Sequence, residues 1–295
     1  MIINTQNLRG IYIGFNTLFS KAFEDVKPLH DKIATVTPST TDAETYAWLG
    51  DIPGMREWIG DREIQNLSGA DYIIKNKDFE LTVGVPRNSI EDDKIGLYTP
   101  HIQMLGQSAA LHPDDLVFTL LKDGFTVKCY DGEPFFSTAH KIGEKTVSNK
   151  GTAKLSLESY TAARAAMMSL TNSKGRPLNL VPNLLVVPPA LEGAALTITK
   201  SEFIGGSTNT MKGTAEPLVV PQLAGKDDAW YLLCTSRPIK PLIYQNRKKA
   251  KFVGLTDEKD PNVFFKKTYI YGADSRGNAG FGFWQMAYGS DGSAN

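Results

Sequence analysis

Cysteine is scarce in this chain of 295 residues, and neither sign of charge is in excess. The two cysteines, Cys129 and Cys234, lie far apart and form no C-x-x-C pair, so the sequence predicts no disulfide framework and fits a reducing compartment. Lysine plus arginine and aspartate plus glutamate both number 32, which gives a formal net charge of zero. That balance disfavours a dedicated nucleic-acid-binding protein and leaves self-association electrostatically unopposed.

Long hydrophobic runs are also missing. No window reaches the roughly 18 consecutive apolar residues of a membrane span, and the start MIINTQNLRG has neither the basic nor the apolar segment of a secretory signal. Hydrophobic residues make up 41% and charged residues 22% of the chain, a composition typical of globular rather than disordered proteins. We expect a soluble protein that is made in the cytoplasm.

The motifs of common enzymes are absent as well. The sequence has no G-x-S-x-G elbow, no G-x-x-x-x-G-K-[ST] phosphate loop and no H-E-x-x-H pair. Four histidines occur, none at metal-ligand spacing: His30, His101, His112 and His140. Glu91-Asp92-Asp93 is interpreted as a solvated hinge rather than a cation site. We therefore predict no catalytic, cofactor-binding or metal-binding residue, and no cofactor.

Two further features have competing interpretations. His140 is either a general base or, as we favour, a polar residue at the end of an element. The only basic cluster, Arg247-Lys248-Lys249-Ala250-Lys251, either contacts nucleic-acid phosphates or, more commonly for such a run, protects a strand end or edge against aggregation. Cys129 is expected to be a small buried apolar residue in a hairpin that turns at Asp131-Gly132.

The clearest local signal is an apolar strand that runs directly into a proline-started helix. Val181 and Leu184 to Val187 form an apolar run that is too short for a helix and typical of a buried strand, and Pro188-Pro189 then favours a first helical turn. We also expect four other helices: one within residues 1–27, one over 95–111, one restarting at Pro113 and ending at Gly124, and one capped by Ser156 and ending near Asn172.

Residues 63–85 predict a long β-hairpin. Strand pieces at 64–67 and 71–75 are followed by a turn at Asn76-Lys77-Asp78, and apolar residues then alternate with polar ones from Phe79 to Val85. An isolated two-stranded hairpin is marginal in water. We therefore expect this one to lie on the body of the protein or on a neighbouring subunit.

Several segments, taken in order, resemble the major head subunit of Mu-type phages, the gpT family. They are CYDGEPFFSTAH (129–140), the helix of 156–172, GRPLNLVPNLLVVPPALEGAA (175–195), WYLLCTSRPIKPLIYQNRKK (230–249) and YIYGADSRGNAGFGFWQMAYGS (269–290). The resemblance spans most of the chain and is strongest after Cys129.

This resemblance implies an α+β chain with the tailed-phage major capsid fold, also called the Hong Kong-type phage fold. The parts would be an N-terminal arm (1–59), an E-loop hairpin (60–93), a peripheral domain with a spine helix (94–182 and 262–295) and an axial domain (183–261). The arm and the hairpin would depend on neighbouring subunits for burial.

The function implied is structural. Subunits would self-assemble as hexamers and pentamers into an icosahedral or prolate shell around double-stranded DNA, which they would contact non-specifically. Scaffolding, portal and possibly decoration proteins would be partners, and no membrane would be involved. Because the chain starts at Met1 with an arm-like segment, we expect a separate scaffolding protein. The subunit would be made and assembled in the host cytoplasm and would reside in the virion capsid.

Two alternatives and one negative expectation accompany that interpretation. A cellular nanocompartment shell of the same fold would package protein cargo instead of DNA. A soluble hydrolase would use His140, although no nucleophile motif supports it. Lys75, Asn76 and Lys77 lie in the predicted hairpin, where a relative of the family forms Lys–Asn cross-links. No matching acceptor or catalytic acid is identified in this sequence, so we expect no cross-linking.

Overall fold

The computed structural model describes residues 2–47, 49 and 72–294. The helices of this part of the chain are α1 (Thr5–Asp25), α2 (His30–Ile33), α3 (Arg87–Glu91), α4 (Thr99–Lys122), α5 (Leu157–Met168), α6 (Glu192–Lys200) and α7 (Pro261–Lys266). The longer strands are β1 (Ala34–Pro38), β4 (Lys77–Pro86), β8 (Leu184–Val187), β11 (Glu216–Val219), β12 (Trp230–Leu233), β13 (Leu242–Leu255), β14 (Thr268–Phe281) and β15 (Ala287–Ser290). The short strands are β2 (Ala43–Thr45), β3 (Ile73–Lys75), β5 (His140–Ile142), β6 (Lys145–Val147), β7 (Lys150–Gly151), β9 (Phe203–Ile204) and β10 (Ser207–Thr208).

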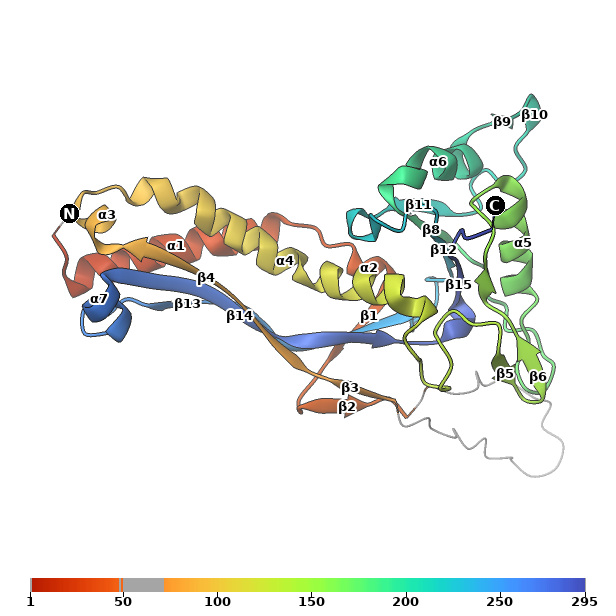
Figure 1. Ribbon diagram of the computed structural model, residues 1–295, viewed down its shortest axis with the longest axis horizontal. Helices are drawn as coiled ribbons and strands as arrows, with labels where there is room; N and C mark the ends of the chain where they lie inside the picture. The colour runs from red at the N-terminus through yellow and green to blue at the C-terminus, as the bar shows by residue number, and fades with distance from the viewer. Residues whose placement is uncertain (1, 48, 50–71, 295) are drawn as a thin grey trace.

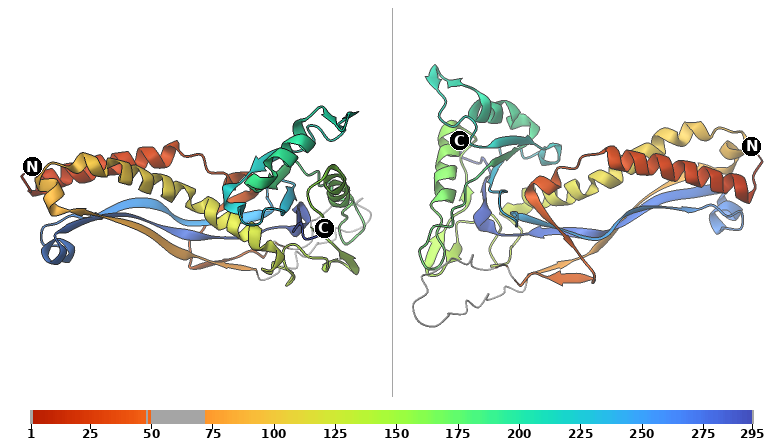
Figure 2. Two further views of the ribbon diagram at one scale, coloured as in Figure 1. Left: turned by 45° about the horizontal axis from the view of Figure 1, so that its top comes forward. Right: turned by 180° about the vertical axis from the view of Figure 1, so that it is seen from behind.

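The molecule has an elongated half and a compact lobe at one end of it (Figures 1 and 2). The elongated half consists of a four-stranded sheet in the order β1-β13-β14-β4, with α1 and α4 side by side on one face. The compact lobe consists of a five-stranded sheet in the order β11-β8-β12-β15-β7 together with α5 and α6. Each half has a buried apolar cluster, and a third cluster lies where the halves meet.

Helix α1 forms because its apolar residues recur every three or four positions. The Asn4 side chain caps it by accepting a hydrogen bond from the backbone N–H of Asn7 at 2.8 Å. The face toward α4 and the sheet buries Leu8, Ile11, Phe15, Phe19 and Ala22. Gly106 of α4 makes the close approach possible, since a Cβ there would stand 2.5 Å from the carbonyl oxygen of Phe19. The helix expected within residues 1–27 is confirmed.

Helix α4 is continuous through Pro113, so the predicted break between two helices is wrong. A proline inside a helix removes one backbone hydrogen bond and disfavours the helix. Here the packing of both halves of α4 outweighs that cost, because residues before and after Pro113, such as Leu105 and Phe118, are buried. The result is one 24-residue helix along the sheet.

The compact lobe follows the local sequence signals closely. Ser156 caps α5 in a capping box with Ser159, as the sequence predicts for the cap. The apolar strand and its proline corner are confirmed as β8, Pro188 and a short 3-10 turn at Pro189–Leu191 that leads into α6. Strand β8 lies between β11, which is parallel to it, and β12, which is antiparallel.

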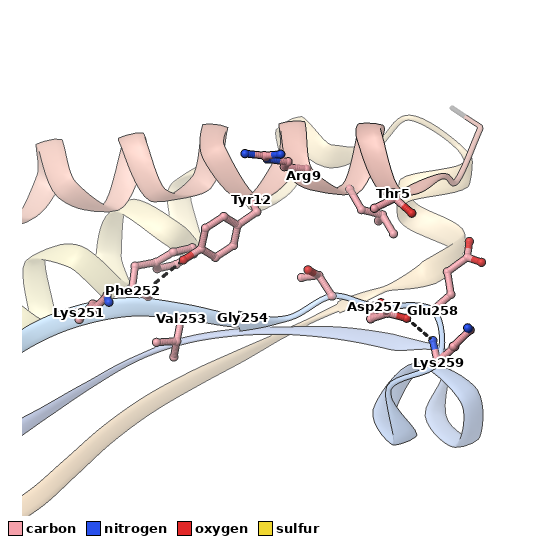
Figure 3. A pocket seen from close by; sticks show the side chains of 12 residues that line it. Thr5, Arg9, Tyr12, Lys251, Phe252, Val253, Gly254, Asp257, Glu258 and Lys259 are labelled. Atoms are coloured by element: carbon pink, nitrogen blue, oxygen red, sulfur yellow. Dashed lines mark hydrogen bonds between the residues drawn. The ribbon is translucent and has the colours of Figure 1, made fainter.

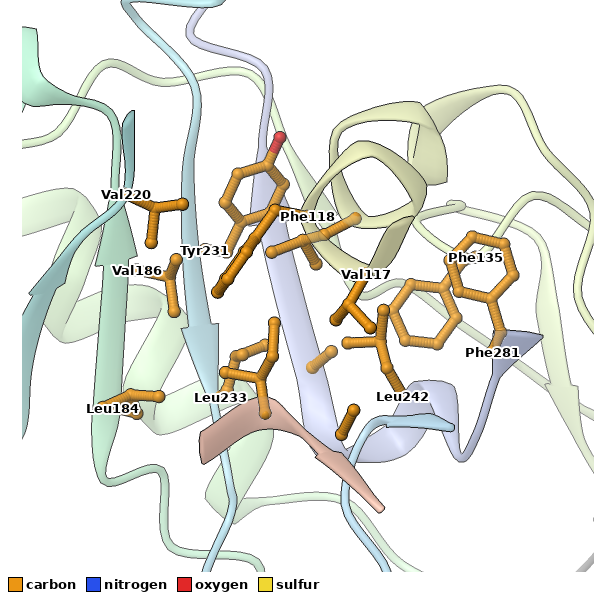
Figure 4. Packing of buried hydrophobic residues seen from close by; sticks show 14 of the residues in the cluster. Val117, Phe118, Phe135, Leu184, Val186, Val220, Tyr231, Leu233, Leu242 and Phe281 are labelled. Carbon is orange, nitrogen blue, oxygen red and sulfur yellow. The ribbon is translucent and has the colours of Figure 1, made fainter. Parts of the chain in front are cut away.

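A buried apolar cluster lies at the junction of the two halves. Phe118 of α4 lies beside Tyr231 of β12, Val117 lies toward Leu242, and the rings of Phe135 and Phe281 stack at a centroid distance of 4.3 Å (Figure 4). All six side chains are at most 1% exposed. Because these residues come from both sheets and from α4, the lobe and the elongated half share one core here.

The predicted hairpin with a turn at Asn76-Lys77-Asp78 is wrong. Strand β3 pairs antiparallel with β2, and β4 pairs antiparallel with β14 along Thr268–Gly277. The alternation from Phe79 to Val85 identifies a strand correctly, but alternation does not specify which strand is the partner. The strand piece predicted at 64–67 lies outside the described residues.

One of the predicted domain boundaries, between 183–261 and 262–295, separates two pairs of strands that are hydrogen-bonded to each other. Strands β13 and β14 form one antiparallel ladder on either side of the boundary between 183–261 and 262–295. Strand β15, in the segment predicted as peripheral (94–182 and 262–295), pairs with β12 in the segment predicted as axial. The sheets thus group the strands into the elongated half and the compact lobe.

Candidate assembly surfaces and buried polar sites

The outer edge of β13 has no paired strand over most of its length. Strand β1 pairs only with Leu242–Asn246, so within the described residues Arg247–Leu255 has β14 on one side and no strand on the other. The basic cluster of the sequence occupies this edge, and the ladder is irregular between Asn246 and Lys251. Both features are typical of edges that avoid uncontrolled strand pairing, as the edge interpretation of the cluster requires.

A groove of about 640 Å³ runs between this edge and α1 (Figure 3). At its floor the hydroxyl of Tyr12 donates to the carbonyl oxygen of Phe252 at 3.2 Å. Its walls carry cations and anions alike, among them Arg9, Lys251 and Asp257. A long open groove of mixed charge beside a free strand edge is suited to a polypeptide segment more than to a small molecule.

The far end of the elongated half exposes two aromatic rings. Phe264 and Phe265 of α7 are 74% and 78% exposed, and their rings meet edge-to-face at 5.0 Å. Helix α7 lies at the end opposite the compact lobe, near the N-terminus (Figure 1). Adjacent exposed phenylalanines of this kind usually mark an interaction surface.

The histidines and the acidic run weighed in the sequence analysis have separate partners in the structure. His30 lies beside Asp114, with 2.7 Å between Nδ1 and Oδ1, and His112 packs on Phe79 at 4.2 Å. In the acidic run, Arg87 pairs with Glu91 and Lys94 with Asp92. Pairing with neighbouring cations on an exposed surface fits the hinge interpretation of this run.

His140 is fully buried at the start of β5, so it lies at an element end, as favoured above. Its Nδ1 lies 2.6 Å from Asp131 Oδ2, and its ring stacks on Trp284 at 4.1 Å. Cys129 is buried beside them, as predicted. Burial raises the pKa of the Cys129 thiol far above its usual range, and the negative charge of Asp131 raises it further. This is the opposite of what activates a cysteine nucleophile.

The sequence missed the roles of Asp114 and Asp131. Asp114 is 1% exposed and accepts hydrogen bonds from His30 and from two backbone amides. Asp131 was recognised only as part of a turn. No spacing rule connects either carboxylate with its histidine.

Among the described helices, none combines the length and apolar character that crossing a membrane needs.

Comparison with known proteins gives matches along the whole chain. The family described as Mu-like prophage major head subunit gpT matches residues 8–155, 147–223 and 222–295. The major capsid protein of Escherichia phage Mu is 34% identical over 287 residues, which cover 97% of this chain and 74% of that protein.

Solved capsid structures match as well. A chain of the bacteriophage JBD30 procapsid is 36% identical, with a TM-score of 0.64 over 99% of this chain and 77% of that one. A chain of the JBD30 capsid decorated with minor capsid protein trimers is 30% identical, with a TM-score of 0.58 over 66% of this chain and 90% of that one. The expected α+β tailed-phage capsid fold is therefore confirmed, and so is the expectation of a structural protein rather than an enzyme. The chain belongs to the Mu-like prophage gpT family of major head subunits, the capsid proteins from which the phage head is built.

Proposed function

We propose that copies of this chain assemble as hexamers and pentamers into a closed icosahedral or prolate shell that encloses double-stranded phage DNA. The observation that carries this proposal is the uncovered surface of the elongated half. It has an unpaired edge from Arg247 to Leu255 at the groove along α1, and the exposed rings of Phe264 and Phe265 at its far end. Neighbouring copies would bury both surfaces in a shell.

The two halves suggest a revised division of the subunit. We assign the peripheral domain to the elongated half, with α4 as the spine helix, and the axial domain to the compact lobe with its five-stranded sheet. Helix α1 belongs to the N-terminal arm. We place the base of the E-loop at the β2–β3 pair instead of at β4, because β4 is an integral strand of the long sheet. Residues 60–71 of the predicted E-loop lie outside the described part of the chain.

The proposed partners are a scaffolding protein, a portal protein and a decoration protein, with assembly in the host cytoplasm. The JBD30 capsid relative is decorated with minor capsid protein trimers, which supports the decoration partner. A formal net charge of zero is compatible with DNA contacts that are non-specific and weak in each copy. No observation favours the alternative of a nanocompartment filled with protein.

Electron microscopy and light scattering of the purified protein, with and without the scaffolding protein, test the shell. We expect closed particles, with nuclease-protected DNA in those isolated from induced host cells.

Phe264→Ser combined with Phe265→Ser should abolish particles without changing the melting temperature of the subunit, since both rings are exposed. The matched control is Phe203→Ser on the compact lobe, 64% exposed. Normal particles from the double variant would exclude the α7 surface from assembly, and particles filled with protein cargo would favour a nanocompartment.

A further inference from the structure

Three side chains of metal-ligating type meet at the junction of the two halves. Cys129 and Asp131 belong to the tight turn at 128–134, and His140 begins β5. Each residue offers one ligand atom, and these three atoms lie within 4.8 Å of one another. They are the cysteine Sγ, a carboxylate oxygen and an imidazole nitrogen. The Sγ of Cys129 is 3.1 Å from Asp131 Oδ1, and His140 Nδ1 is 2.6 Å from Asp131 Oδ2. No other such group of three occurs within the described residues.

The surroundings fix the orientation of the His140 ring. Its Nε2 lies 3.2 Å from the carbonyl oxygen of Phe135, and a carbonyl oxygen only accepts hydrogen bonds, so Nε2 carries a hydrogen. The indole of Trp284 holds the ring flat, with an interplanar angle of 4°. Nδ1 faces the carboxylate of Asp131, and a hydrogen lies between Nδ1 and Oδ2 because two lone pairs cannot meet at 2.6 Å. A bound ion would take the place of that hydrogen. Metal-bound histidines are typically held in this way, with the second ring nitrogen donating to a carbonyl or carboxylate.

The three donor atoms favour one class of metal ion over others. One sulfur, one imidazole nitrogen and one carboxylate oxygen match the ligands of zinc and of its spectroscopic substitute cobalt(II), whereas calcium and magnesium prefer oxygen ligands alone. The Asp131 side chain is 22% exposed while His140 is fully buried. An ion can therefore enter from the Asp131 side, where a fourth position stays open to water.

We propose that Cys129, Asp131 and His140 form a three-ligand site for a divalent transition-metal ion of the zinc class. Zinc bonds of about 2.0 to 2.3 Å in a tetrahedron separate neighbouring ligand atoms by about 3.3 to 3.8 Å. The pair Nδ1–Oδ2 has to widen by roughly 1 Å to reach that spacing, which a small rotation of the partly exposed Asp131 side chain supplies. On binding, the proton of the Cys129 thiol and the proton between His140 Nδ1 and Asp131 Oδ2 are released to solvent, and the sulfur coordinates as thiolate.

Binding of the ion would link two segments of the subunit and stabilise its folded state. The ion would join the 128–134 turn to β5 beside Trp284, next to the Phe135–Phe281 stack that connects the two halves. A ligand that binds only the folded state raises its stability in proportion to the logarithm of the ligand concentration above Kd. The metal would therefore stabilise the junction of each subunit.

Cobalt titration of the full-length subunit, first stripped of metal with a chelator, tests the site. We expect one Co²⁺ per chain with a thiolate-to-cobalt absorption band, and a melting temperature at least about 3 °C higher at a hundredfold excess of Zn²⁺ over Kd. Cys129→Ala should lose the absorption band, and Asp131→Asn should weaken binding at least tenfold. The matched control is Cys234→Ala, which removes the other buried cysteine and should bind as the parent does.

Either of two results would overturn the proposal. One is the absence of a thiolate–cobalt band in the unmodified protein, a measurement that does not depend on whether any variant folds. The other is a band that persists in Cys129→Ala and disappears in Cys234→Ala. Shell formation is scored separately, so loss of metal binding leaves the assembly proposal untouched.

Discussion

The imidazole of His30 and the carboxylate of Asp114 form a buried pair, 2.7 Å apart between Nδ1 and Oδ1, although 84 positions separate them in sequence. The same carboxylate accepts hydrogen bonds from the backbone amides of Leu29 and His30. One side chain of α4 thus fixes the segment that leads from α1 into β1. This contact attaches the segment between α1 and the edge strand β1 to α4.

We expect Asp114→Ala to lower the free energy of unfolding by about 3 to 5 kcal/mol, because it leaves a buried histidine and two backbone donors without an acceptor. Urea unfolding followed by circular dichroism measures the change. The control is Asp115→Ala, one residue further along on the exposed surface, which should cost less than about 1 kcal/mol. Equal losses in the two variants would show that the pair adds nothing specific to stability.

Local signals explain why part of the fold could be predicted from the sequence. The Ser156 cap and the β8–Pro188–α6 corner depend on residues a few positions apart, so the sequence carries all the information needed. The strand at Phe79–Val85 was identified for the same reason. Its partner was not, since β14 lies almost 200 residues away and sequence alternation carries no pairing code.

The buried polar groups were missed for a related reason. Asp114 follows Pro113, where an acid favours a helix start, and only the packing of α1 and α4 shows that the helix continues and that the carboxylate points inward. Cys129, Asp131 and His140 are close in sequence, but their spacing matches no common metal motif. Folding of the turn against β5 brings them together.

Trp284 supports a second prediction about the junction. Its side chain is 1% exposed and stacks on His140, and it lies in a 3-10 turn at Trp284–Met286. We expect Trp284→Ala to cost about 3 to 5 kcal/mol in unfolding free energy, measured by urea denaturation. Phe264→Ala, at an exposed position, should stay within about 0.5 kcal/mol. A value near zero for Trp284→Ala would show that this ring does not support the core.

Buried tyrosines predict how stability depends on alkaline pH. Burial raises the pKa of Tyr244 from 10.0 to about 12, and burial together with the charge of Glu44 does the same for Tyr46. The unfolded chain therefore releases these protons first, so stability is unaffected below pH 10 and decreases as the pH rises from 10 to about 12. Urea unfolding across this range, with phenolate absorbance recorded in parallel, measures the decrease. Tyr244→Phe should show a shallower decrease, and an identical slope would contradict the assignment to Tyr244.

The β13 edge gives the last prediction. Arg247 and Lys251 are exposed beside an unpaired strand edge, and cations at such positions oppose pairing with other chains. Replacing both by valine should accelerate aggregation of dispersed subunits into β-rich species, because it removes the charge and increases β-propensity. Light scattering and a dye specific for cross-β structure follow the rate. The control replaces Lys21 and Lys226, which are exposed cations outside strands, by valine. This double variant should leave the aggregation rate unchanged. Equal aggregation rates for the two double variants would mean that the edge is protected by its irregular ladder or by the adjacent α1 rather than by charge.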